Sequence, residues 1–339
     1  MKRNAVIACM IVLAVFFAVP LFAGGSADGK AAGKPPVGPS DPIEWLVGQA
    51  PGSGQDNSSR QMEKAIRTNN IIPNPIQFTY KAGGNTGVAL QWLKTQKGRS
   101  DLIMYASSQL IMTPLQMDVG AKREDLTDIA FFGESFQFLW VTKEKAAKEG
   151  WKTFADVVKS GKPVSFTMNG VGSPEDLTIQ FLKKKIPGAD FRAVPVSGDG
   201  EGMTQLLGGH VDIFINELAG GGTESYRVTG DIIALACTAG RRSIFAPAVP
   251  TLKEMGYDFS MTTWPVLMGP PGMSKEAIAF WQDVAKKIFD SKEHTEFQNL
   301  KGVEPVFKTG KEMADYLDNY KKEMIALFNI AGYKLVPNP

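Results

Sequence analysis

Short apolar runs alternate with amphipathic segments from residue 43 almost to the end of the chain, and this alternation limits the fold more than any other feature. The apolar runs, which predict buried strands, are 43–47, 76–80, 101–106, 136–142, 163–168, 191–196, 211–216, 231–237 and 263–269. The amphipathic segments, which predict helices, are 57–69, 86–97, 153–160, 174–185, 200–208, 275–290 and 311–331. Strands that alternate with helices in this way predict α/β sheets with parallel strands. So many strands in a chain of 339 residues indicate two sheets and therefore two domains.

The first forty residues read as an export signal followed by a tether. Lys2 and Arg3 precede an apolar run that ends at Phe22, and small residues follow it. This pattern predicts a signal peptide over residues 1–23, cleaved near Ala23, with a retained membrane anchor as the alternative. Residues 24–40 are rich in Gly, Pro, Ala and Ser and predict a flexible linker. We therefore expect an exported protein, soluble once cleaved and periplasmic.

Composition argues against several classes of partner. The formal net charge is +2, and no block of like charge indicates a nucleic acid or an anionic membrane surface. The two cysteines are Cys9, inside the predicted signal, and Cys237, inside a predicted buried strand. The mature chain therefore has no partner for an internal disulfide, and Cys237 is expected to be a small core residue.

Motifs for enzyme chemistry are missing from the sequence. The two histidines, His210 and His294, are far apart, and we expect both at the surface. No H-E-x-x-H, C-x-x-C, G-x-S-x-G or G-x-x-x-x-G-K-[ST] pattern occurs, and GQAPGSG lacks the spacing of a dinucleotide-binding loop. We therefore predict no metal, no cofactor and no enzymatic activity. Catalysis by carboxylates leaves little trace in one sequence, so an exported enzyme that uses Asp176 and Glu217 stays open as an alternative.

Turns of small and polar residues recur where the predicted strands end. In open α/β sheets, ligands bind beyond the carboxyl ends of the strands. Glycines let backbone N–H groups approach a ligand, and helix N-termini carry partial positive charge, so such turns can hold an anion without arginine. The candidate ligand-binding residues in and beside these turns are Gly52, Ser53, Gly54, Asn85, Thr86, Ser107, Ser108, Asn169, Gly172, Ser173, Asp176, Gly198, Asn216 and Glu217. The alternative for any single turn is that it only connects a strand to the next helix.

Six motifs in a fixed order resemble those of a known receptor family. The segments are GQAPGSGQDNSSR (48–60), YKAGGNTG (80–87), SFTMNGVGSPEDL (165–177), LLGGHVD (206–212), RSIFAPAVPTLKEMG (242–256) and WPVLMGPPG (264–272). No single segment is specific, but the ordered set resembles the extracytoplasmic solute receptors of tripartite tricarboxylate transporters, the TctC-like or Bug receptors.

The resemblance implies a type II periplasmic binding protein of the Venus-flytrap kind, in which each domain is a mostly parallel sheet flanked by helices. Domain I would comprise residues 41–142 plus 261–339, and domain II residues 143–260. Such receptors are monomers that close by a hinge on a small carboxylate and deliver it to a membrane permease. We expect the carboxylate to be held around Ser53, Gly54, Asn85 and Thr86, and domain II to close over it with Asn169, Gly172 and Ser173. A receptor that signals through a membrane sensor is the alternative.

The sequence departs from the family pattern at several acidic or hydroxylated positions. Asp176 stands where the family usually has a histidine, Ser53 adds a hydroxyl to the first loop, and Glu217 adds an acid. Asp56 and Asp176 could each cap the helix that follows instead of facing a ligand. If Asp56, Asp176 or Glu217 faces the cleft, the ligand is expected to be an amine- or hydroxyl-bearing carboxylate, because a bare tricarboxylate would be repelled.

Overall fold

The computed structural model describes residue 38, residues 42–220 and residues 222–337. The predicted signal peptide, and all of the predicted linker except residue 38, lie outside these residues. The strands are β1 Ile43–Val47, β2 Ile76–Tyr80, β3 Leu102–Ala106, β4 Thr127–Phe131, β5 Glu134–Ser135, β6 Phe138–Thr142, β7 Val164–Met168, β8 Phe191–Pro195, β9 Phe214–Asn216, β10 Ile232–Cys237, β11 Val266–Gly269 and β12 Val303–Glu304. The helices are α1 Gly54–Thr68, α2 Gly87–Thr95, α3 Gln109–Gln116, α4 Lys143–Glu149, α5 Phe154–Ser160, α6 Pro174–Lys185, α7 Asp199–Leu207, α8 Thr223–Thr229, α9 Lys275–Phe289, α10 Lys292–Lys301 and α11 Gly310–Ala331, with a short 3₁₀ helix η1 at Arg123–Asp125.

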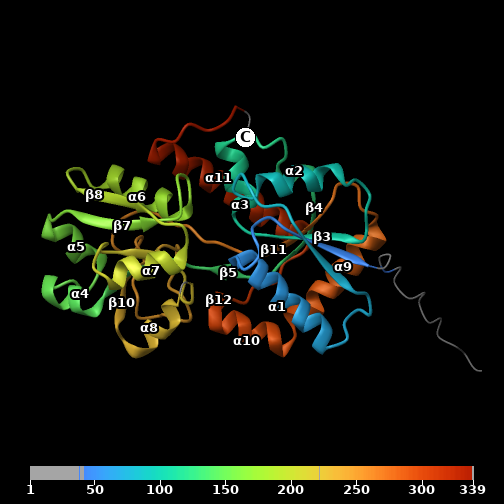
Figure 1. The fold of residues 1–339 in the computed structure, drawn as a ribbon. Coiled ribbons are helices and arrows are strands. Elements are labelled where there is room, and N and C mark those ends of the chain that lie inside the picture. The colour runs from blue at the N-terminus through green and yellow to red at the C-terminus, as the bar shows by residue number, and fades with distance from the viewer. Residues whose placement is uncertain (1–37, 39–41, 221, 338–339) are drawn as a thin grey trace, which may run out of the picture. The chain divides into compact units, whose positions relative to one another are not determined.

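The largest sheet has the strand order β2-β1-β3-β11-β4. Figure 1 labels three of these strands, β3, β11 and β4. β1 pairs in parallel with both β2 and β3, but β11 runs antiparallel to both β3 and β4. The prediction of a mostly parallel sheet is therefore wrong here, and the sheet is mixed. β11 lies well over a hundred residues after β3 and β4 in the chain, so no βαβ crossover connects it to either strand, and nothing obliges it to run parallel to them.

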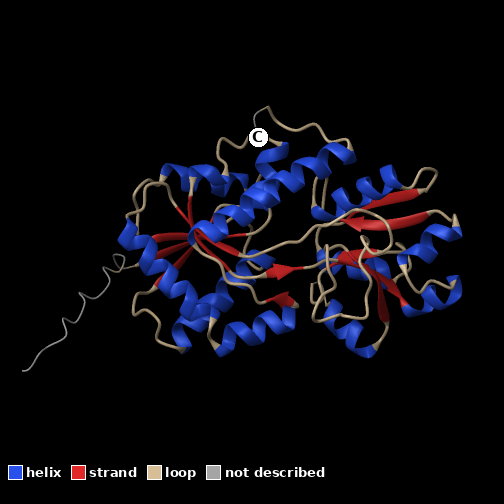
Figure 2. Ribbon diagram, turned by 180° about the vertical axis from the view of Figure 1, so that it is seen from behind, coloured by secondary structure: helices blue, strands red, loops and turns tan. Residues whose placement is uncertain are grey.

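β1 is buried on both faces, as expected of a central strand in a sheet covered by helices. Successive side chains of a strand point to opposite faces, so Trp45 and Leu46 enter different parts of the core. Trp45 packs with Met62 of α1 and Trp281 of α9, whereas Leu46 joins a cluster that includes Met324 of α11. The alternation of strand and helix in the sequence thus corresponds to a sheet with helices on both faces (Figure 2).

The segment between β5 and β11 forms smaller sheets. β6 pairs antiparallel with both β10 and β9, β7 pairs in parallel with β8, and the two sheets touch through an isolated bridge between Phe166 and Ile213. Cys237 in β10 is fully buried, which confirms its expected place in the core. All described residues belong to one compact unit, and the proposed boundaries of domains I and II remain a prediction.

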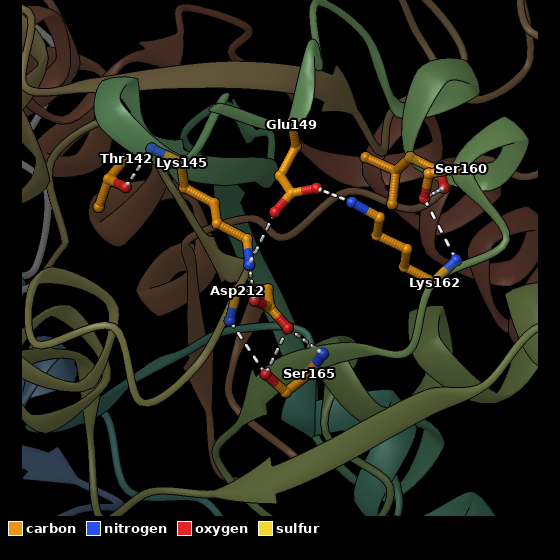
Figure 3. Close-up of polar contacts among 8 residues, drawn as sticks. Thr142, Lys145, Glu149, Ser160, Lys162, Ser165 and Asp212 are labelled. Carbon is orange, nitrogen blue, oxygen red and sulfur yellow. Dashed lines mark hydrogen bonds and ion pairs between the residues drawn. The ribbon is translucent and has the colours of Figure 1, made fainter. Parts of the chain in front are cut away.

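Asp212, the last residue of the LLGGHVD motif, links its own segment, just before β9, to β7 and α4 (Figure 3). Its Oδ2 accepts hydrogen bonds from the backbone N–H and the hydroxyl of Ser165 on β7, both at 2.8 Å, and its Oδ1 lies 2.9 Å from Nζ of Lys145 on α4. Lys145 also faces Glu149, which pairs with Lys162 (Figure 3). Burial would raise the pKa of Asp212, but the hydrogen bonds from Ser165 and Lys145 outweigh it and lower the pKa. The last residue of this motif therefore forms a structural ion pair.

Candidate ligand-binding cavity

A cavity of about 870 Å³ lies where the carboxyl ends of β1, β2, β3, β7, β8 and β9 meet the first turns of the following helices. The residues that line it and were candidates from the sequence are Gly52, Ser53, Gly54, Asn85, Ser107, Ser108, Asn169, Ser173, Gly198, Asn216 and Glu217. Thr86, Gly172 and Asp176 lie in the same turns but do not line this cavity. The fold thus brings most of the candidate turns together around one cavity. Their role in ligand binding remains a prediction.

The first turn of α1 presents free backbone donors beside the cavity. Ser53 is the N-cap of α1, and its hydroxyl accepts a hydrogen bond from the N–H of Asp56 at 3.3 Å. The N–H groups of Gly54 and Gln55 come earlier in the helix and have no intrahelical partner. Both residues line the cavity, where the partial positive charge of the helix N-terminus favours an anion.

Asp56 holds this turn together and does not face the cavity. Its carboxylate accepts hydrogen bonds from the backbone N–H of Gly52 at 2.7 Å and the hydroxyl of Tyr80 at 2.7 Å, and pairs with Nε of Arg60 at 3.0 Å. Burial would raise the pKa of Asp56, but these three donors outweigh it, so the pKa is lowered. Of the two roles that the sequence left open for Asp56, the geometry favours the cap.

The start of α6 repeats this arrangement. The hydroxyl of Ser173 accepts a hydrogen bond from the N–H of Asp176 at 3.3 Å, and the Asp176 carboxylate accepts one from the N–H of Gly172 at 2.8 Å. The hydroxyl of Tyr333 also donates to Asp176, in the place that Tyr80 has at α1. Asp176 lines a second cavity of about 320 Å³ together with Tyr333, and the geometry again favours a cap.

Gly-Ser-x-x-Asp therefore occurs twice, at Gly52–Asp56 and Gly172–Asp176, although the sequence showed no obvious internal repeat. Gly52 has φ +82° and Gly172 has φ +75°, the left-handed region that favours glycine. The two helices are thus capped in the same way, with a serine at each start.

The loop between β2 and α2 carries unusual backbone strain next to the cavity. Asn85 and Thr86 have φ +48° and +77°, and a β-branched residue such as threonine rarely adopts this region. The Thr86 hydroxyl is buried and accepts a hydrogen bond from Nε2 of Gln55, and the Asn85 carbonyl accepts one from the hydroxyl of Thr113. Thr86 thus contacts the first turn of α1 through Gln55 and does not line the cavity, whereas Asn85 does.

Among the described residues, three carboxyl groups line the cavity: Glu175, Asp199 and Glu217. Only Glu217 was a candidate from the sequence. The Glu217 carboxylate accepts a hydrogen bond from the hydroxyl of Thr263 at 2.8 Å. Glu175 is 5% exposed and accepts a hydrogen bond from Nε2 of Gln137, while its Oε2 has no partner among the described residues. Burial raises the pKa of both Glu175 and Glu217, and the negative charge of Asp199 raises each further.

His294 also lines the cavity, so its predicted surface position is wrong. It is 3% exposed and packs edge-on against Phe132, with ring centroids 5.4 Å apart. Burial lowers its pKa to about 4, so the ring is neutral at neutral pH, and neither ring nitrogen has a partner among the described residues. His210 is exposed, as predicted.

The described residues contain no group of three His, Cys, Asp or Glu side chains placed to hold a metal ion. In the same part of the chain, no helix has both the length and the apolar character to cross a bilayer.

A cavity at the strand ends of an α/β fold, lined by serines and helix N-termini, is a place where such folds bind a small ligand. Residues 59–331 match the sequence model of the tripartite tricarboxylate transporter family receptor, and the chain belongs to this family. It is 26% identical over 302 residues to Protein BugT of Bordetella pertussis, a match that covers 88% of this chain and 91% of that protein.

Two solved structures from Rhodopseudomonas palustris share the fold. One, which holds adipate, has a TM-score of 0.72 at 18% identity and covers 88% of this chain and 99% of its own. The other, MatC with bound malate, has a TM-score of 0.66 at 17% identity and covers 86% of this chain and 99% of its own. The fold class predicted from the sequence is confirmed, except that the sheets are mixed. The matched family is a receptor family, which supports a role without catalysis.

Proposed function

We propose that this chain is a periplasmic receptor that binds a small carboxylate in the 870 Å³ cavity and delivers it to a membrane permease of the tripartite tricarboxylate type. The observation that carries the proposal is the first turn of α1, where the Ser53 hydroxyl and the N–H groups of Gly54 and Gln55 border the cavity. Such a turn can hold a carboxylate without arginine. The adipate and malate bound to the structural neighbours are carboxylates of suitable size.

The proposed mechanism is closure of domain I on domain II around the ligand. Ser53, Gly54 and Asn85 would bind the carboxylate from domain I, and Asn169 and Ser173 would reach it from domain II. A ligand favours closure only if it contacts the closed form better than the open form, and residues that meet on the ligand from both domains provide that difference.

The test is to replace Ser173 with phenylalanine, with Ser225→Phe as the matched control. Ser173 lines the cavity, whereas Ser225 is an exposed residue of α8. Ser173→Phe also removes an N-cap, which costs about 1 kcal/mol of stability, so circular dichroism must show that the variant is folded. A phenyl ring in the cavity should then weaken binding of a tight carboxylate, found with a ligand panel by calorimetry, by about 100-fold or more, equal to about 2.7 kcal/mol.

Ser225→Phe should bind like the unmodified protein. If folded Ser173→Phe keeps the original affinity, the carboxylate is not held between α1 and α6 and the proposed site is wrong.

A further inference from the structure

The two sides of the cavity differ in charge. Every lining residue from Gln49 to Met117, the side built by the starts of α1, α2 and α3, is uncharged. All the acidic lining residues, Glu175, Asp199 and Glu217, come from the segment between β7 and β10. Lys301 is the single lysine or arginine among the lining residues, and its Nζ contacts the carbonyl of Ala219 at 3.4 Å. The described lining therefore carries three carboxyl groups against one ammonium group.

The first turns of α1 and α6, which are capped in the same way, also differ in charge. The second residue after the N-cap serine is Gln55 in α1 and Glu175 in α6. The residue between is Gly54 in α1, which offers an N–H, and Pro174 in α6, which has none. Compared with the α1 turn, the α6 turn has one N–H donor fewer and one carboxyl group more. We therefore expect a ligand carboxylate to bind better at the α1 turn.

Helix capping explains part of this acidity but not all of it. Glu175 and Asp199 lie in the first turns of α6 and α7, where the helix dipole favours a negative side chain. Glu217 follows strand β9 and has no such support. A buried carboxylate is costly unless a cation or several donors compensate it.

A second observation points to a donor group at the same side of the cavity. Gln137 lines the cavity and is 5% exposed. Its Nε2 donates a hydrogen bond to Glu175, and its Oε1 has no partner in the part of the chain that the structure describes. Within the described residues, Oε2 of Glu175 is unpartnered as well. These groups are acceptors, or can act as acceptors. An ammonium group has three N–H donors and no acceptor, so it can donate hydrogen bonds to these acceptors and also neutralise the negative charge of the carboxylates. A hydroxyl group can donate a hydrogen bond but does not neutralise the charge.

We propose that the ligand is a zwitterion: its carboxylate lies at the α1 turn, and its ammonium group lies among Glu175, Asp199 and Glu217. The inference rests on the proposed receptor function and narrows the substrate class to amino-carboxylates. It also assigns the two charged ends of the ligand to opposite sides of the cavity.

The experiment measures the affinity for pairs of compounds that differ by one ammonium group, by calorimetry at neutral pH. The pairs are succinate and aspartate, glutarate and glutamate, and butyrate and γ-aminobutyrate. In at least one pair the aminated member should bind at least about 10-fold more tightly, the difference expected for one hydrogen-bonded charge pair.

Glu217→Gln tests the site of the ammonium group directly. The glutamine keeps an acceptor for Thr263 but removes the charge, so the aminated ligand should bind about 10-fold to 100-fold more weakly. Binding of the partner without the ammonium group should stay the same or tighten. Glu296→Gln is the matched control, because Glu296 is exposed on α10 and does not line the cavity. It should bind both members of each pair like the unmodified protein.

The outcomes separate the two proposals. If compounds without the ammonium group bind as tightly as their aminated partners or more tightly, or if Glu217→Gln keeps the full preference, the zwitterion inference is wrong and the receptor function stands. If the folded protein binds no member of any pair and no other carboxylate, both proposals are overturned.

Discussion

Replacing Asp56 with asparagine tests whether this residue builds the α1 turn or touches the ligand. The side chain is 4% exposed and has three donors around it: the N–H of Gly52, the hydroxyl of Tyr80 and Nε of Arg60. Asparagine has almost the same size but carries no charge. It also keeps only one acceptor oxygen and turns an NH₂ group toward a donor.

The expected loss of stability follows from these contacts. A hydrogen bond to a charged group contributes about 1.5–3 kcal/mol, and Asp56→Asn loses one such bond and weakens the others. We therefore expect the free energy of unfolding to fall by about 2–4 kcal/mol. For a chain of this size, 1 kcal/mol corresponds to roughly 2–4 °C in Tm, so Tm should fall by about 5–15 °C.

The effect should depend on pH in a defined direction. The folded-state pKa of Asp56 lies below its value of about 3.9 in the unfolded chain. Its contribution to stability is therefore complete above about pH 4 and is lost as the pH falls through the folded-state pKa. Thermal unfolding followed by circular dichroism should show the largest difference between Asp56→Asn and the unmodified protein near neutral pH, and a smaller difference in acid.

Asp190→Asn is the control, because it makes the same chemical change in an exposed ion pair with Arg192 and should leave Tm almost unchanged. Asp56→Asn should also bind ligand within a few-fold of the original affinity, since Ser53 and Gly54 line the cavity and Asp56 does not. An unchanged Tm would refute the capping role. A normal Tm with abolished binding would make Asp56 a ligand contact instead.

Two further variants probe groups away from the α1 turn. Asp212→Asn should lower the free energy of unfolding by about 1–3 kcal/mol in urea titrations, because it disturbs the hydrogen bonds from Ser165, and should leave ligand affinity unchanged; weaker binding at full stability would contradict its structural role. His294→Gln should flatten the dependence of Tm on pH between about 4 and 6.5. The native ring has a pKa of about 4 and the unfolded ring titrates near 6.5, so the unfolded chain binds the proton more strongly and stability falls as the pH drops through this window. An equal slope in the variant and the unmodified protein would show that His294 is not neutral in the fold.

Most of the strands and of the longer helices could be predicted because each carries its own periodicity, but β4, β5 and β12 were not predicted. The segments 43–47 and 76–80 match β1 and β2 residue for residue, and 174–185 matches α6. The missed helices lack such a signal. Pro114 lies inside α3, and α4 begins directly after β6, with Thr142 as its N-cap and no loop to mark the change. Strand direction was mispredicted for β11 because pairing depends on contacts far apart in the sequence.

The site could be predicted in part, because the turns after parallel strands meet at one edge whatever their exact residues. Glu175 was missed although it lies in the SPED segment, since an acid in the first turn of a helix already has a capping explanation. His294 was missed because its segment is rich in charge. Its signal was the spacing: Ser291 caps α10, and His294 and Gln298, four residues apart, are both buried. That spacing marks one face of a helix.

In the repeated Gly-Ser-x-x-Asp turn, the residues that form the capping hydrogen bonds are different from the residue whose charge differs between the two copies. In both copies the glycine, serine and aspartate are engaged with one another, so a change at any of them disturbs the turn itself. The second residue after the serine is not one of these three, and it is Gln55 in one copy and Glu175 in the other. Glu175→Gln should therefore leave the α6 turn intact and make the two helix starts alike in charge. If the cavity binds a zwitterion, this variant should lose affinity for the aminated member of a ligand pair and gain affinity for the other; a stable variant with an unchanged preference would show that the charge at this position does not select the ligand.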